Sequence, residues 1–276
     1  MKSTEDIIGR YVRVDGTRVH YDELGEGTPL VLIHTLYACS LEWTRIMPLL
    51  AASGFHCVAL DLPGNSRSYP PNWKPLSDPR EYGDFIARFI QTLFGDQKVV
   101  IAGTSIGGNL AIDLTLRHSS LVAAAIAMEG GVWTPTVMPL APFANPASLP
   151  SWPEWLERCA LESLNPNVDP EVREELKWQH RFTGHRSGLL QANCWTNQDL
   201  RDVAGPVSCP LLVINGEYDF YLPQALMELP KELIPNCETR TLPDIGHYPM
   251  CEDPELITTI IEEFVRRHQL KAKPLS

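Results

Sequence analysis

The stretch from residue 99 to residue 114 constrains the fold most strongly, because it joins three local patterns without a linker. Val99 to Ala102 is a short apolar run rich in β-branched side chains, which is typical of a buried parallel strand with helices on both faces. The run leads directly into Gly103-Thr104-Ser105-Ile106-Gly107, and helical spacing follows. A strand, a tight turn and a helix in succession predict an α/β fold with Ser105 at the carboxyl end of a strand.

The same alternation of apolar runs and helical segments recurs along the chain. Helical spacing is found at Trp43 to Ala52 and at Tyr82 to Phe94, and the amphipathic segment Pro254 to His268 closes the pattern. Asp15-Gly16 predicts an antiparallel hairpin at the start of the sheet. The other predicted strands are Pro29 to Ile33, His56 to Leu60, Val122 to Met128, Pro210 to Ile214 and Glu238 to Leu242. This order predicts a largely parallel sheet with crossover helices.

The alternation of predicted strands and helices stops at Trp133 and resumes after about residue 204. Eight prolines fall within residues 135 to 170, and five of the seven tryptophans lie in the interrupted region. Helical segments occur within it. We therefore predict a core formed by residues 1–132 and 205–276, and an inserted helical cap at residues 133–204.

Composition excludes several classes of partner and site. The chain has 34 acidic and 23 basic residues and a net charge of −11, which disfavours binding to nucleic acid or to an anionic membrane. Seven cysteines are scattered without a C-x-x-C pair, so we predict reduced thiols, a cytoplasmic location and no zinc site. No signal peptide or membrane span is predicted. The predicted partner is a small molecule, and the oligomeric state is left open, with a homodimer as one alternative.

The pentapeptide around Ser105 fits the pattern G-x-S-x-G. A nucleophile on a strained strand-to-helix turn needs small residues two positions to either side, because Cβ atoms there would collide across the turn. The turn also directs the N–H of Ile106 and the helix N-terminus at one point, where developing negative charge is stabilised. These features predict that Ser105 is a catalytic nucleophile.

A serine nucleophile needs a base, and His247 is the best candidate among the eight histidines. It lies in a loop after the last predicted strand. The third member of the site is a carboxylate that orients the imidazole of the base, and there are two candidates for it. Asp219 and Glu129 each follow a predicted strand, and either would fill this role. The histidines interpreted as structural or solvated are His20, His56, His118, His180, His185 and His268.

Five motifs in register give the chain a resemblance to the α/β-hydrolase family over nearly its whole length. They are Ile33-His34, Asp61-Leu62-Pro63-Gly64-Asn65-Ser66-Arg67-Ser68, the Ser105 turn, Gly216 to Asp219, and Gly246-His247 with Glu252-Asp253-Pro254. The resemblance implies an eight-stranded sheet with a helical cap and no cofactor. By analogy, the backbone N–H groups of Leu36 and Ile106 form the oxyanion hole.

The chain departs from the family pattern after the first parallel strand, where His34 is followed by Thr35 instead of glycine. A similar His-Thr occurs in the hydroxynitrile lyases of this fold, so a cofactor-free lyase is an alternative. Those lyases have a lysine directly after the catalytic histidine, and this chain has Tyr248 there. The difference favours hydrolysis. A small-ligand receptor on the same fold is a further alternative.

A narrower resemblance is to the lactonases that open zearalenone. It depends on Ala51-Ala52-Ser53-Gly54-Phe55, on the Asp61 to Ser68 segment, and on Glu129 at 24 residues beyond Ser105. That resemblance implies Glu129 as the triad acid, whereas the commoner position in the family favours Asp219. Asp219 is our preferred acid and Glu129 the alternative.

The sequence thus predicts a serine hydrolase that cleaves a carboxylic ester or lactone through an acyl-enzyme on Ser105. The tryptophans in the predicted cap suggest an apolar or aromatic substrate. The predicted substrate-binding residues are Thr35, Trp133, Trp178 and Tyr248. No metal is predicted.

Overall fold

The protein contains a central sheet of eight strands in the order β1-β2-β4-β3-β5-β6-β7-β8. This computed structural model describes residues 6–134, 152–182, 185–221 and 228–270. The strands are β1 (Ile8–Val14), β2 (Thr17–Leu24), β3 (Thr28–Ile33), β4 (Phe55–Leu60), β5 (Val99–Thr104), β6 (Val122–Met128), β7 (Leu211–Gly216) and β8 (Cys237–Leu242). Strand β2 is antiparallel to both β1 and β4, and the other neighbours are parallel. The predicted eight-stranded, mostly parallel α/β-hydrolase sheet is confirmed.

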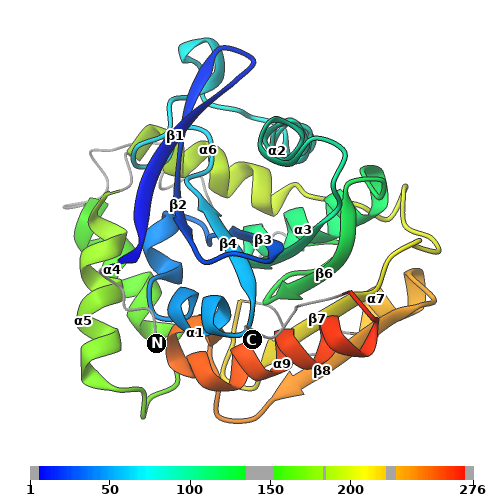
Figure 1. Cartoon of the computed structure of the whole chain (residues 1–276). Helices are drawn as coiled ribbons and strands as arrows, with labels where there is room; N and C mark the ends of the chain where they lie inside the picture. Colours follow the sequence, from blue (N-terminus) through cyan, green and yellow to red (C-terminus); the bar gives the residue numbers. More distant parts are fainter. Residues whose placement is uncertain (1–5, 135–151, 183–184, 222–227, 271–276) are drawn as a thin grey trace.

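Helices cover both faces of the sheet (Figure 1). Helices α2 (Pro79–Phe94) and α3 (Ile106–Arg117) lie on one face, and α1 (Met47–Ala52) and α9 (Pro254–Arg267) lie on the other. Strand β5 is buried along its whole length, which explains its continuous apolar sequence. The remaining helical elements are η2 (Ser40–Trp43), η3 (Pro71–Trp73), α4 (Trp152–Glu162), α5 (Pro170–Gln179), η6 (His180–Phe182), α6 (His185–Thr196), α7 (Glu228–Leu233) and α8 (Pro249–Glu252).

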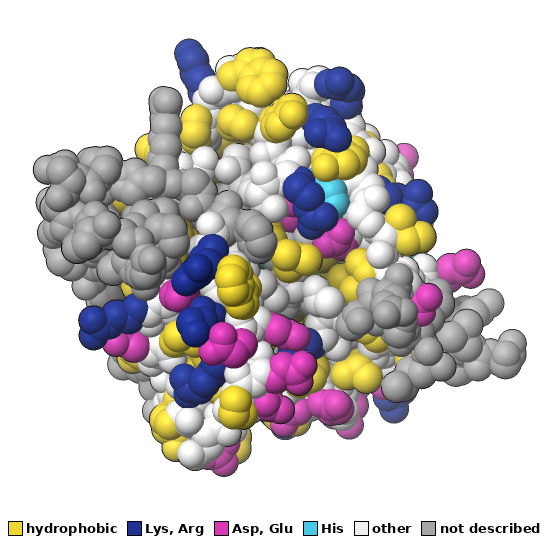
Figure 2. Space-filling view, turned by 90° about the vertical axis from the view of Figure 1, so that its left-hand side faces the viewer, with side chains coloured by type: hydrophobic (Ala, Val, Ile, Leu, Met, Phe, Trp, Pro, Cys, Tyr) yellow, Lys and Arg dark blue, Asp and Glu magenta, His cyan; other side chains and the backbone are white. Residues whose placement is uncertain are grey.

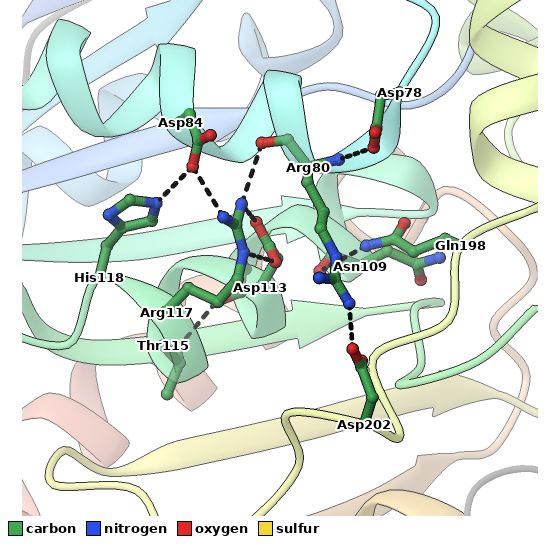
Figure 3. Close-up of polar contacts among 11 residues, drawn as sticks. Asp78, Arg80, Asp84, Asn109, Asp113, Thr115, Arg117, His118, Gln198 and Asp202 are labelled. Carbon is green, nitrogen blue, oxygen red and sulfur yellow. Dashed lines mark hydrogen bonds and ion pairs between the residues drawn. The ribbon is translucent and has the colours of Figure 1, made fainter.

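A polar cluster joins α2 to α3 (Figure 3). Arg117 donates hydrogen bonds to Asp113 one helical turn earlier, at 2.6 and 2.7 Å, and to Asp84 of α2 at 2.8 Å. His118 also bonds Asp84, at 2.9 Å. A Cβ atom on Gly83 would lie 1.8 Å from the Asp113 carboxylate, so glycine permits this close contact. The cluster links the C-terminal half of α3 to α2, about two to three helical turns from Ser105.

Helices α4, α5 and α6 belong to the region predicted to form the cap. Arg45 of the core donates to Glu175 of α5 at 2.6 Å, and Asn65 donates to Gln191 of α6 at 3.2 Å. The cap boundaries at residues 133–204 stay a prediction, and residues 135–151 and 183–184 lie outside the described part of the chain.

The surface shown in Figure 2 carries acidic and basic side chains next to one another, with hydrophobic side chains gathered at its upper end. Within the described ranges, no helix combines the length and the apolar character that crossing a membrane requires.

Candidate active site

Ser105 lies on a strained turn between β5 and α3. Its backbone has φ 57° and ψ −119°, a region that residues other than glycine rarely occupy. A Cβ on Gly103 would lie 2.1 Å from the carbonyl oxygen of Gly107, and a Cβ on Gly107 would lie 2.2 Å from that of Ile33. The glycines on both sides of Ser105 are therefore required by backbone packing, as the sequence predicted.

His247 lies in the loop between β8 and α8, and this loop is held from two sides. Its backbone N–H donates to the carbonyl of Ser163 at 2.9 Å. The partly buried carboxylate of Glu252 accepts from the N–H groups of Gly246, at 3.0 Å, and Tyr248, at 3.1 Å. These bonds fix the backbone on either side of the imidazole.

His247 and Asp219 form a buried hydrogen-bonded pair. The two atoms His247 Nδ1 and Asp219 Oδ2 are 3.0 Å apart, and the other oxygen of Asp219 accepts from the N–H of Tyr221 at 2.8 Å. With Nδ1 donating to the carboxylate, Nε2 of His247 is the nitrogen left to act as a base. Ser105 and His247 line the same cavity.

Glu129 is a second carboxyl group beside this pair. Glu129, Asp219 and His247 each offer an atom within 4.8 Å of the others, and one Glu129 oxygen accepts from the N–H of Gly216 at 2.7 Å. Burial and the charge of Asp219 raise the pKa of Glu129 well above its usual range. Burial acts to raise the pKa of Asp219 too, but His247 and a hydrogen bond from Glu129 lower it overall. Glu129 is thus the neutral acid and Asp219 the carboxylate.

The proximity of these three side chains follows from the adjacent ends of β6 and β7 and from the hydrogen bond between Asp219 and His247. The absence of a metal at this site stays a prediction.

The turn after β3 presents the other expected oxyanion donor. His34 donates from Nδ1 to the carbonyl of Thr35 at 2.7 Å, since its Nε2 accepts from the N–H of Leu62 at 2.9 Å. Within the described residues, the N–H groups of Leu36 and Ile106 have no hydrogen-bond partner. Both are thus available to a ligand oxygen, and their role as the oxyanion hole stays a prediction.

The cavity around Ser105 is small, about 40 Å³, and mostly apolar. Its lining comes from the turn after β3 and from α4, η6, α6 and the His247 loop. The lining residues are Thr35, Leu36, Tyr37, Ser105, Cys159, Ala160, His180, Trp195, Tyr221, His247 and Tyr248. The structure thus brings Thr35 and Tyr248, two predicted substrate-binding residues, to the cavity.

The other two predicted substrate-binding residues, Trp133 and Trp178, do not line the cavity, and this part of the prediction is corrected. Trp178 is 61% exposed on α5, so it faces solvent. The ring of Trp133 is covered by the guanidinium of Arg201, 4.4 Å from the ring centroid. Among the tryptophans whose side chains the structure describes, Trp195 lines the cavity, and it is buried.

His180 was interpreted as structural from the sequence, but it lines the cavity and contacts Tyr248. Its Nδ1 donates to the carbonyl of Leu176 at 2.8 Å, so Nε2 accepts from the hydroxyl of Tyr248 at 3.0 Å. Burial lowers the pKa of His180 to about 4.

Sequence reasoning also missed Tyr37 and Tyr221. No spacing rule identifies these residues, because they reach the cavity from separate elements.

A model of the alpha/beta hydrolase family matches residues 30–258. The chain belongs to the alpha/beta hydrolase family. It is 28% identical over 261 residues to a pimeloyl-[acyl-carrier protein] methyl ester esterase of Aeromonas hydrophila, covering 90% of this chain and 99% of that relative. It is 26% identical over 280 residues to a 2-hydroxy-6-oxo-6-(2'-aminophenyl)hexa-2,4-dienoic acid hydrolase of Metapseudomonas resinovorans, covering 96% and 93%.

Solved structures share the fold. An enol-lactonase from Burkholderia xenovorans superposes with a TM-score of 0.84 at 20% identity, covering 93% of this chain and 100% of that one. The family match and the activities named for the relatives support the predicted enzyme class, a carboxylic ester hydrolase or lactonase.

Proposed function

We propose that the protein is a serine hydrolase that cleaves a carboxylic ester or lactone through an acyl-enzyme on Ser105. The observation that carries this proposal is the buried His247–Asp219 pair, with its 3.0 Å hydrogen bond, at the cavity that Ser105 also lines. A nucleophile, a base and an orienting carboxylate are the groups that acyl transfer needs.

In the proposed reaction, Ser105 Oγ attacks the carbonyl carbon while Nε2 of His247 takes the hydroxyl proton. Asp219 stabilises the imidazolium, and the N–H groups of Leu36 and Ile106 stabilise the oxyanion. Collapse breaks the bond to the alcohol oxygen, which takes the proton from His247. Water then attacks the acyl-enzyme by the same proton route and restores Ser105.

The lining favours a neutral, apolar or aromatic acyl group. Among the described residues that line the cavity there is no Lys or Arg, so within this part of the lining a free carboxylate on the substrate has no cation to pair with. The rings of Tyr37, Trp195 and Tyr221 offer aromatic surface. Zearalenone, an aromatic lactone, is the candidate that the sequence resemblance suggests; it is larger than the cavity of about 40 Å³, so its binding requires the lining side chains to move apart.

The lyase alternative is disfavoured by the contacts of Thr35. Its hydroxyl donates to Glu42 at 2.6 Å, so that proton is not directed at a substrate. Tyr248, at the position where the lyases have lysine, donates to His180.

The test is hydrolysis of p-nitrophenyl esters and of aromatic lactones including zearalenone, together with labelling of Ser105 by a fluorophosphonate. We expect Ser105→Ala to abolish both labelling and turnover. Asp219→Asn should lower kcat about 10⁴-fold, as expected when the base loses its orienting carboxylate, and Glu129→Gln should lower it about tenfold or less. A larger loss in Glu129→Gln would assign the acid to Glu129. A wild type that neither turns over the panel nor accepts the label would rule out the serine hydrolase.

A further inference from the structure

Glu42 is a buried acidic residue that the proposed mechanism does not use. It lies in η2, only 1% exposed. One of its carboxylate oxygens accepts from the backbone N–H of Thr35 at 2.8 Å, and the other accepts from the Thr35 hydroxyl at 2.6 Å. Both oxygens therefore hold one residue of the turn after β3. We call this pair of hydrogen bonds the Glu42–Thr35 clamp.

The clamp lies next to the peptide group that carries the N–H of Leu36. The carbonyl of that peptide belongs to Thr35 and accepts from His34 at 2.7 Å. In a trans peptide the C=O and N–H point in opposite directions, so this bond directs the N–H of Leu36 away from His34. Glu42 holds the N–H and the hydroxyl of Thr35, and His34 holds its carbonyl. Thr35 is therefore fixed on both sides of its Cα.

The clamp depends on the charge of Glu42. No Lys or Arg in the described ranges forms an ion pair with it, and the ionisable groups that interact with it are His247, Tyr248, Cys39 and Cys251. Burial raises the pKa of Glu42 to about 7, although the Thr35 bonds and His247 act to lower it. A protonated carboxyl has a hydroxyl at one oxygen, and it then no longer offers two full acceptors to Thr35.

We infer that Glu42 is a positioning residue for the oxyanion hole, whose ionised carboxylate holds Thr35 and thereby fixes the direction of the Leu36 N–H. The inference rests on the proposed serine hydrolase. Because an oxyanion donor acts mainly on the transition state, loss of the clamp lowers kcat and leaves KM nearly unchanged.

The first experiment compares ester hydrolysis by wild type and Glu42→Gln between pH 6 and pH 8.5. At pH 8 we expect kcat to fall about 10- to 100-fold, somewhat less than loss of a whole oxyanion donor, with KM within about threefold. The ratio of wild-type to variant kcat should shrink toward pH 6, where Glu42 of the wild type is itself protonated. Because His247 interacts with Glu42, the full pH profile of each protein is recorded, and the ratio is taken from the two fitted profiles.

Asp113→Asn is the matched control. Asp113 is also a buried carboxyl, but it lies eight residues along α3 from Ser105, or about 12 Å at 1.5 Å per residue, and it bonds Arg117 (Figure 3). We expect its kcat to stay within about twofold of wild type, with a constant ratio across pH.

Thr35→Val provides a second variant in case Glu42→Gln does not fold, as judged by circular dichroism. It removes one of the two clamp bonds and keeps the N–H, and we expect kcat to fall about 3- to 10-fold. Combined with Glu42→Gln, its effect should be less than multiplicative, since both changes remove the same bond. The rate of fluorophosphonate labelling, which also develops charge on an oxygen, should fall in parallel.

Two results, each with an active wild type, would overturn the inference alone. The first is an unchanged kcat in Glu42→Gln, or in Thr35→Val if Glu42→Gln does not fold. The second is a ratio of wild-type to Glu42→Gln kcat that does not vary with pH. If wild type hydrolyses no ester and takes no label, the proposed function fails, and the inference fails with it.

Discussion

The turns after β5 and β3 each carry one of the two proposed oxyanion donors, but they are held by different means. The turn after β5 is fixed by close packing of backbone, where Gly107 leaves no room for a Cβ atom. The turn after β3 is fixed by hydrogen bonds from the side chains of His34 and Glu42. The first turn is therefore sensitive to added volume, and the second is sensitive to charge and pH.

The largest effect is expected from Gly107→Ala, which tests the volume-sensitive turn. The new Cβ would lie 2.2 Å from the carbonyl oxygen of Ile33, and backbone atoms at that distance must shift. We expect the free energy of unfolding to fall by about 3 kcal/mol and esterase activity to fall at least 100-fold at every pH. Urea unfolding and steady-state kinetics measure both. Gly205→Ala is the control, because nothing lies within 4 Å of its Cβ position; an equal loss in both variants would contradict the packing argument.

The second prediction concerns stability and the charge-sensitive turn. The pKa of Glu42 is raised from 4.5 to about 7 in the folded protein, so the folded state binds more protons than the unfolded state between these pH values. The contribution of Glu42 to the free energy of unfolding is therefore complete below pH 4.5 and is lost as pH rises through 7. Relative to Glu42→Gln, wild type should lose about 3 kcal/mol of unfolding free energy over this interval.

Urea unfolding of both proteins at a series of pH values measures that difference. Titrations of the other groups cancel from the comparison, apart from those that interact directly with Glu42. A difference that stays constant with pH, or that grows in favour of wild type, would mean that Glu42 is ionised in the folded state at every pH tested.

The smallest effect is expected from Thr35→Ser. Serine keeps both the N–H and the hydroxyl that bond Glu42, and only a buried methyl group is lost. We therefore expect kcat within about twofold of wild type and a stability loss of about 1 kcal/mol. A loss of kcat as large as that of Thr35→Val would show that the methyl group, and not the hydrogen bond, positions the turn.

The sequence was informative where local backbone geometry dictates residue type. The strained turn at Ser105 permits only small residues two positions to either side, so the glycines at 103 and 107 are visible in the sequence. Asp219 and Glu129 could both be identified as carboxyl groups at strand ends. The sequence alone could not decide which of the two bonds His247, because β6 and β7 are neighbouring strands and bring both carboxyl groups to the same place.

The missed residues depend on long-range packing. Glu42 carries no motif, and its role arises only because the chain folds back seven residues later onto Thr35. Trp178 was expected at the cavity because its region is rich in tryptophan, but composition does not tell which side of α5 faces solvent. His180 reaches the cavity for a similar reason, through the packing of η6 against Tyr248.

The neutral Glu129 beside Asp219 has an evolutionary consequence. A chain with one acid at this position loses its catalytic function if that acid mutates, whereas this chain holds a second carboxyl group within 4.8 Å of His247. Burial is the main reason that the pKa of Glu129 is raised, and the charge of Asp219 adds to it, so loss of Asp219 would let the remaining acid ionise more readily. Loss of Asp219 would still cost most of the activity, as predicted above, but the carboxyl group that remains on the neighbouring strand gives later substitutions a starting point from which to restore it.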